Sequence, residues 1–188
     1  MRERIVERYE LTENGEIIID VSVRNIEDLY DNFDKRAHSF KKDLNQDLVK
    51  YLIDSILEIE KEKFIIRFNL ESQTQTDSVE RLKNSIKNFF IYLQELESKK
   101  MKEMILASSV FFIMGLLIAS VSVPMNQSDF IKTNMAFAVI AEGLTVAAWV
   151  SLWESLATFL IKWMPYKKKI FLYGRIANAK IECNFGKL

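Results

Sequence analysis

Two carboxylates, Glu142 and Glu154, interrupt an otherwise apolar part of the sequence. A carboxylate in a hydrocarbon environment is costly, and such groups often carry protons or bind cations. Ser151 and Thr158 lie within about one helical turn of Glu154. Two interpretations stay open. The carboxyls handle protons or cations, or they are structural, being protonated, reaching the interface, or bonded to Ser or Thr on a neighbouring helix.

The two glutamates are not expected to meet within one chain. They are twelve residues apart, which on a helix is about 18 Å along the axis and about 120° around it. Their carboxyls therefore converge only across a helical hairpin or in an oligomer.

Other familiar chemistry is missing from the sequence. With one cysteine (Cys183), one histidine (His38) and five glycines, the chain lacks a disulfide framework, a multi-cysteine metal site and a glycine-rich phosphate loop. Acidic residues between 20 and 34 could hold a divalent cation, but such a run is more often a solvated face. We predict no catalytic residue, no metal site and no cofactor. The acidic residues are Asp20, Glu27, Asp28, Asp31 and Asp34.

The charges divide the chain into three zones, although 26 basic and 26 acidic side chains balance overall. Residues 1–103 have a net charge of −4, residues 104–164 of −1 and residues 165–188 of +5. Because the first zone is acidic and has no basic patch interleaved with aromatics, nucleic-acid binding is not expected.

The nearly uncharged zone predicts a transmembrane hairpin over residues 104–164. Met104–Val123 holds twenty residues without a charge, about the length that spans a bilayer. A polar loop, residues 126–134, leads to a second apolar stretch, Met135–Met164. Lysines cluster before the first span and after the second, so the positive-inside rule places both termini in the cytoplasm. The expected location is the cell membrane, as a multi-pass protein.

Two further sets of residues suit such a hairpin. Small residues on one side of the first span allow close helix packing: Ser108, Gly115, Ala119 and Ser122. Aromatic and basic residues of the second span are candidate interfacial anchors: Trp149, Trp153, Trp163, Lys167, Lys168 and Lys169.

The first 76 residues predict an α+β domain with a three-stranded sheet and helices. Alternating strands over residues 5–11 and 17–23 flank Asn14-Gly15, which is typical of a type I′ turn. Residues 63–70 form a third alternating strand. Between them we expect a short helix after Asn25, a polar linker and an amphipathic helix over residues 44–59.

A stalk helix over residues 77–103 is predicted next. Asp77 and Glu80 resemble a capping box, and nothing before Pro124, which is expected to end the first span, breaks a helix. The stalk either continues into the span or breaks near residues 97–102. The basic tail, residues 165–188, is expected to be helical, and its residues 181–185 could add an edge strand.

Several segments together resemble a family of small two-span prokaryotic membrane proteins of unknown function. They are IEDLYDNFDKR, FKKDLNQDLVKYLIDS, KFIIRFNL and AEGLTVAAWVSLWESLATFLIKWMP. The resemblance implies an architecture and no activity.

The leading hypothesis is a membrane protein, not an enzyme, whose cytosolic domain binds a partner or signal and is coupled to a self-associating hairpin. The expected partners are the lipid bilayer, further copies of the chain, and a protein or small-molecule signal. The alternative is a channel-forming or membrane-permeabilising oligomer that uses Glu142 and Glu154. A hydrolase acting at the membrane surface is a third, weaker hypothesis.

Overall fold

The computed structural model describes residues 7–30, 44–71, 76–129 and 133–186. The linker with His38 and the carboxylates Asp31 and Asp34 lie outside the described residues. The chain divides into two compact units. We call Met1–Glu95 with Ile170–Leu188 the sheet unit, and Leu96–Lys169 the hairpin unit.

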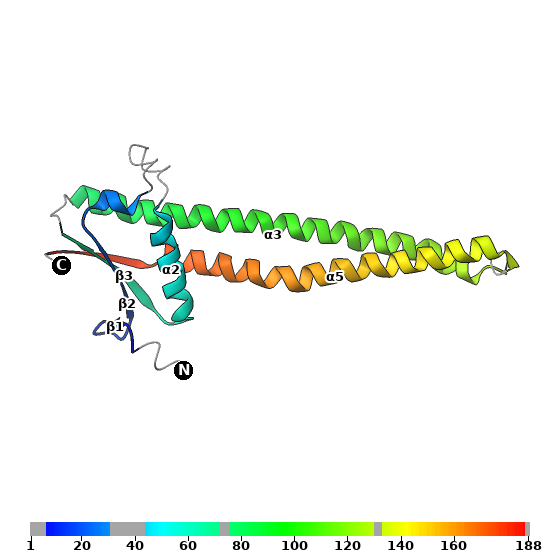
Figure 1. The fold of residues 1–188 in the computed structure, drawn as a ribbon, viewed down its shortest axis with the longest axis horizontal. Helices are drawn as coiled ribbons and strands as arrows, with labels where there is room; N and C mark the ends of the chain where they lie inside the picture. The colour runs from blue at the N-terminus through cyan, green and yellow to red at the C-terminus, as the bar shows by residue number, and fades with distance from the viewer. Residues whose placement is uncertain (1–6, 31–43, 72–75, 130–132, 187–188) are drawn as a thin grey trace. The chain divides into compact units, whose positions relative to one another are not determined.

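The sheet unit contains four strands in the order β1-β2-β3-β4 (Figure 1). β1 (Glu10–Leu11) is antiparallel to β2 (Ile17–Val23), which is parallel to β3 (Phe64–Leu70). β4 (Lys180–Phe185) runs parallel to β3 on its other edge. The prediction of three strands was therefore wrong by one. The C-terminal strand satisfies backbone groups that β3 would otherwise leave unpaired at an edge.

The β1–β2 turn is not the predicted type I′ turn. A type I′ turn needs positive φ at both central residues, and Gly15, with φ of 75°, has it whereas Asn14 does not. The Gly15 N–H donates to the Thr12 carbonyl at 2.9 Å, and the Thr12 N–H donates to the Glu16 carbonyl at 2.8 Å. This pattern matches a type I turn followed by a glycine in the left-handed conformation.

Helical segments connect β2 to β3, as parallel strands require. η1 (Ile26–Leu29) is one 3₁₀ turn, shorter than the predicted helix after Asn25. α2 (Gln46–Glu58) forms within the predicted range. The Asn45 side chain caps it by accepting the Asp47 N–H at 2.8 Å.

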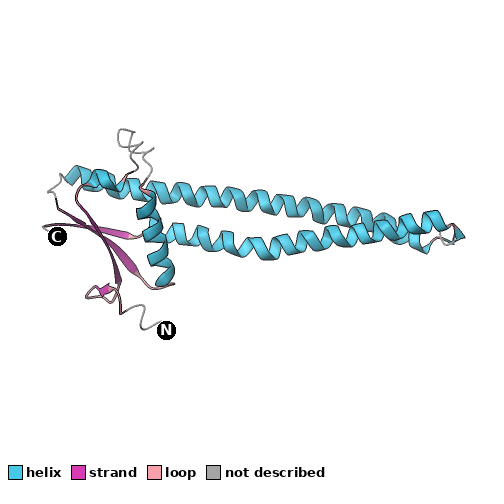
Figure 2. Ribbon diagram, viewed as in Figure 1, coloured by secondary structure: helices cyan, strands magenta, loops and turns pink. Residues whose placement is uncertain are grey.

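Two long helices follow, α3 (Thr76–Gln127) and α5 (Met135–Ala177) (Figure 2). α3 continues through residues 97–102, so the alternative of a break there was wrong. Pro124, which was predicted to help end the first span, lies inside α3, and the helix ends three residues later at Gln127. Asp77 lies inside the first turn, where it pairs with Arg81, and is not the N-cap.

The sheet unit has one hydrophobic core, to which both long helices contribute. Phe68 of β3, Leu52 of α2, Phe90 of α3 and Ile176 of α5 are all fully buried in it. The start of α3 and the end of α5 are therefore built into the sheet unit. This grouping differs from the predicted division into residues 1–76, 77–103, 104–164 and 165–188.

Candidate functional site

A seam of small side chains joins α3 and α5 in the hairpin unit. The buried small residues recur every seven positions on each helix, which keeps them on the facing sides of a helix pair. Small side chains let the two backbones approach closely. They are Ser108, Gly115 and Ser122 on α3, and Ala141, Ala148 and Ser155 on α5.

Polar contacts along the seam define its antiparallel register. Near one end, the Ser155 hydroxyl donates to the Ser108 carbonyl at 2.7 Å. Near the other, the Asn126 amide donates to the Thr145 hydroxyl at 2.8 Å. From the first contact to the second, the residue number rises on α3 and falls on α5, so the two helices run in opposite directions.

The structure places the predicted packing residues in this seam, apart from one. Ser108, Gly115 and Ser122 are buried, and Ala119 is half-buried. The matching residues on α5 were not predicted. Their seven-residue spacing was the available signal, but alanine and serine are so common in apolar helices that the spacing did not stand out.

Gly115→Ile is expected to force the helices apart. A Cβ at Gly115 would lie 2.8 Å from Leu152 Cγ, so we expect overpacking to destabilise the helix pair by about 1–3 kcal/mol. Disulfide formation between cysteines at Asn126 and Thr145, in a Cys183→Ser background, reports the effect. Gly143→Ile is the matched control, since nothing lies within 4 Å of its added Cβ. Equal cross-linking in the two variants would contradict a close contact at Gly115.

Glu142 and Glu154 both lie on the exposed surface of the hairpin unit, at different positions along α5. Glu142 is three residues nearer the connecting loop than Thr145, and Glu154 is adjacent to Ser155 of the other end. Within the hairpin unit the structure does not bring the two carboxyls together. The Thr158 hydroxyl lies 3.5 Å from Glu154 Oε1 on the same helix.

The candidate anchors fall into two groups. Trp149 and Trp153 flank Leu152 and are about 70% exposed. Trp163 stacks on Phe159, with ring centroids 5.9 Å apart, and Lys167 Nζ lies 4.5 Å from the Trp163 ring centroid. The other two candidate anchors, Lys168 and Lys169, are exposed. Ser151, predicted as an intramembrane polar residue, is half-buried.

A buried carboxylate, Glu97, was missed by the sequence analysis. Its side chain is 8% exposed and lies 2.8 Å from Lys100 Nζ and 3.8 Å from Lys169 Nζ. Glu97 stands seven residues before Met104, which is also buried, so the spacing of the seam was the only signal for it. The Glu97–Lys169 pair links α3 to α5 at the end of the hairpin unit, whereas Lys100 is on the same helix as Glu97.

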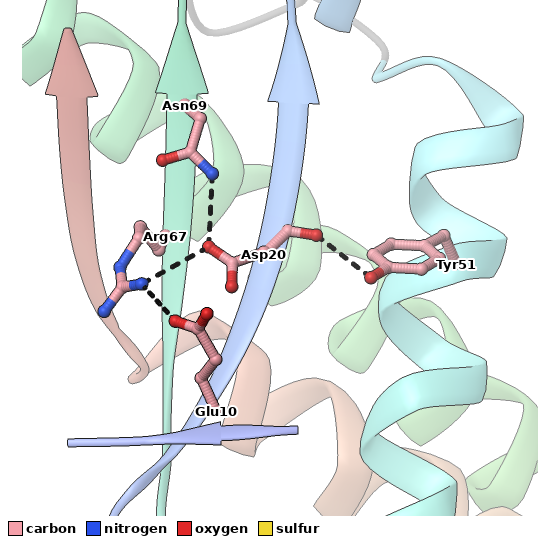
Figure 3. A network of polar contacts seen from close by, with 5 residues as sticks. All are labelled: Glu10, Asp20, Tyr51, Arg67 and Asn69. Atoms are coloured by element: carbon pink, nitrogen blue, oxygen red, sulfur yellow. Dashed lines mark hydrogen bonds and ion pairs between the residues drawn. The ribbon is translucent and has the colours of Figure 1, made fainter. Parts of the chain in front are cut away.

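The sheet unit carries a polar network on the sheet face opposite its core (Figure 3). Arg67 of β3 lies 3.0 Å from a Glu10 carboxylate oxygen and 3.7 Å from one of Asp20. Asn69 donates to the same Asp20 oxygen at 3.2 Å, and Tyr51 of α2 donates to the Asp20 carbonyl at 3.0 Å. The network ties three neighbouring strands and α2 together.

A groove of about 350 Å³ borders this network between β2 and α2. Its carboxylates outnumber its cations: Glu10, Asp20, Asp54 and Glu58 against Arg8. Partial burial and the adjacent Glu58 carboxylate, which accepts the Tyr9 hydroxyl at 2.9 Å, raise the pKa of Tyr9. Arg67 pairs with Glu10 and Asp20, and Arg8 lies 3.9 Å from Glu58, so the arginines offset part of this charge and the lining stays net negative.

Cys183 is expected to react slowly in the folded protein. Burial raises the pKa of its thiol, and only the thiolate is nucleophilic. Folding therefore stabilises the protonated thiol, a contribution that is present below the ordinary thiol pKa and is lost as the pH rises through the raised value. Alkylation followed against pH should have its midpoint above that of the denatured chain. Coinciding midpoints would contradict a buried thiol.

The chain has no detected similarity to known proteins. No family model, curated protein or solved structure matches the chain. Among the described residues, no three His, Cys, Asp or Glu side chains are grouped to hold a metal ion. The resemblance to small two-span membrane proteins stays a prediction.

Proposed function

We propose that the protein spans the cell membrane twice and that its sheet unit, in the cytoplasm, binds a partner or signal. One observation carries the membrane assignment. The two helices bury small residues against each other and leave large apolar side chains outside, the reverse of a soluble helix pair. On α3 these outer side chains are 47–61% exposed: Phe111, Phe112, Ile113, Met114, Leu116 and Leu117.

The register of the seam supports an anchoring role for the hairpin. Glu154 lies beside Ser155, which contacts Ser108, about 6 Å along α3 from Met104. Glu142 lies near the other end of the apolar stretch, because Thr145 already contacts Asn126 beyond Val123. Glu142 is then close to a membrane surface, whereas Glu154, nine residues and about 14 Å before Trp163 on α5, lies deeper in the apolar stretch.

The same register separates the tryptophans by depth. Trp149 and Trp153 flank Leu152, which packs at Gly115 near the middle of Met104–Val123. A place at mid-bilayer does not suit an interfacial anchor. Trp163 lies beside Lys167, and this position suits an interfacial anchor. We propose that Trp149 and Trp153 instead face another copy of the hairpin.

Cysteine accessibility tests the topology. In intact cells, cysteine at Ser128 in a Cys183→Ser background should react with a membrane-impermeant maleimide. The native Cys183 should react only after permeabilisation and denaturation. Ser128 sits beyond the end of α3 and Cys183 in β4. A protected Ser128→Cys in intact cells would refute the proposed orientation.

The groove between β2 and α2 supports the binding role. A photoreactive residue at the exposed Asp54 should form a discrete adduct in cells, and Glu58→Gln should reduce it. The same residue at the exposed Asp47, which does not line the groove, is the control. Adducts of equal yield at both positions would argue against a specific site.

A channel-forming oligomer remains the second candidate function, favoured by the exposure of both glutamates on the hairpin. In that case the protein in liposomes should conduct cations, and Glu142→Gln or Glu154→Gln should reduce the flux. No flux from the unmodified protein in any oligomeric state would eliminate this candidate.

A further inference from the structure

An apolar groove runs along one side of the hairpin unit. It has a volume of about 430 Å³, and its lining includes Phe112 and Phe159 together with Ser108, Ser109 and Ser155. Its residues on α3 extend from position 105 to 113, about 12 Å of helix. This length is close to the roughly 15 Å of one leaflet of the hydrocarbon core.

A strip of stacked side chains leads from this groove toward the lysine-rich end of the hairpin. Phe159, Trp163 and Lys167 recur every four residues on α5, so they share one helix face. The rings of Phe159 and Trp163 stack at 5.9 Å, and the Lys167 ammonium lies 4.5 Å from the Trp163 ring centroid. The surface thus changes from apolar to aromatic to cationic in the order of a lipid's chain, interface and headgroup.

A second cation flanks the same end. Lys102 is exposed on α3, three residues before Ile105, which lines the groove. Side chains three residues apart lie on the same side of a helix. Lys102 and Lys167 therefore present positive charge from both helices at the cationic end of the strip.

We infer that this surface binds an anionic phospholipid of the cytoplasmic leaflet, with one acyl chain in the groove and its headgroup phosphate between Lys102 and Lys167. The inference rests on the proposed membrane insertion and adds a lipid preference to it. The charge of the two ammonium groups favours an anionic headgroup over a zwitterionic one, and the groove supplies an apolar slot at the matching depth.

Quenching of Trp163 by brominated lipids tests the site. The full-length protein, with Trp149→Phe and Trp153→Phe, is reconstituted into phosphatidylcholine vesicles that contain increasing brominated phosphatidylglycerol or brominated phosphatidylcholine. Brominated phosphatidylglycerol should quench Trp163 fluorescence at a lower mole fraction than brominated phosphatidylcholine does. Lys167→Gln should weaken this preference about fivefold. Lys168→Gln removes the same charge from a different helix face and should change it little.

Filling the groove provides an independent test. Ser109→Phe should reduce the preference, whereas Ser120→Phe should not. Both serines are exposed on α3 and donate to carbonyls of their own helix, but only Ser109 lines the groove. Equal effects of Ser109→Phe and Ser120→Phe, or of Lys167→Gln and Lys168→Gln, would overturn the inference.

Three other outcomes are informative. Cross-linked dimers that Ser109→Phe abolishes would show that a second copy occupies the groove, and would also overturn the lipid site. Absence of quenching by either lipid would refute membrane insertion itself. Equal quenching by the two lipids would refute only the anionic preference.

Discussion

Leu117→Arg should exclude most of the protein from the membrane. Leu117 is 61% exposed on α3, two residues from Gly115 of the seam, so in the proposed insertion it faces lipid near mid-bilayer. Arginine near the middle of a spanning helix costs about 2.5–3.5 kcal/mol on the insertion scale. The fraction of protein that resists carbonate extraction from membranes measures this effect.

The matched control is Leu57→Arg. Leu57 is 57% exposed on α2 in the sheet unit, so it has nearly the same exposure as Leu117. Substitutions at exposed positions of a water-soluble surface usually change stability by less than about 0.5 kcal/mol. If Leu117→Arg behaved like Leu57→Arg, the outer face of the hairpin would be in water and the membrane assignment would fail.

Phe90→Ala is expected to unfold the sheet unit. Phe90 is fully buried, and its ring centroid lies 5.6 Å from that of Phe89 and 6.1 Å from that of Tyr173 on α5. Removing a buried phenylalanine costs about 3–5 kcal/mol, a large share of the stability of a small domain. Denaturant unfolding of the protein in detergent, followed by Cys183 alkylation, measures the loss.

Tyr92→Ala is the control, because Tyr92 is on the same helix and is 56% exposed. Its unfolding midpoint should stay close to that of the unmodified protein. If Phe90→Ala and Tyr92→Ala had equal midpoints, the start of α3 would not be part of the sheet-unit core.

Most individual elements could be predicted because their signals are local. The alternation of Ile17, Ile19 and Val21 marks β2, and Phe64–Leu70 forms as the third predicted strand. The uncharged run Met104–Val123 marks the apolar part of α3. Each of these patterns depends only on residues that are neighbours in the chain.

The incorrect predictions concern positions where the local sequence pattern is compatible with several backbone conformations. Asn14-Gly15 occurs in turns of more than one type, and the structure uses the one that leaves only Gly15 at positive φ. Pro124 resembles a helix terminator, yet α3 ends three residues later. A proline removes only its own N–H bond to the residue four positions earlier, so the residues that follow it can still make helical hydrogen bonds.

The candidate site was predictable only in part. The sequence shows that Glu142, Glu154 and the serines of the first span lie in an apolar region. It does not show the register of α3 against α5, which sets the depth of each glutamate and pairs Ser108 with Ser155. The spacing of Glu97 from Met104 is only a weak signal, and the groove beside Phe112 and Phe159 depends on residues of both helices.

The sequence by itself determined the composition of each zone, namely two helices long and apolar enough to cross a membrane and an α+β segment before them. Those properties follow from hydropathy and periodicity along the chain. Only the tertiary structure decided that β4 completes the sheet beside β3, and that small residues form the seam. Strand neighbours and helix registers depend on contacts between residues far apart in the chain, and local patterning does not specify them.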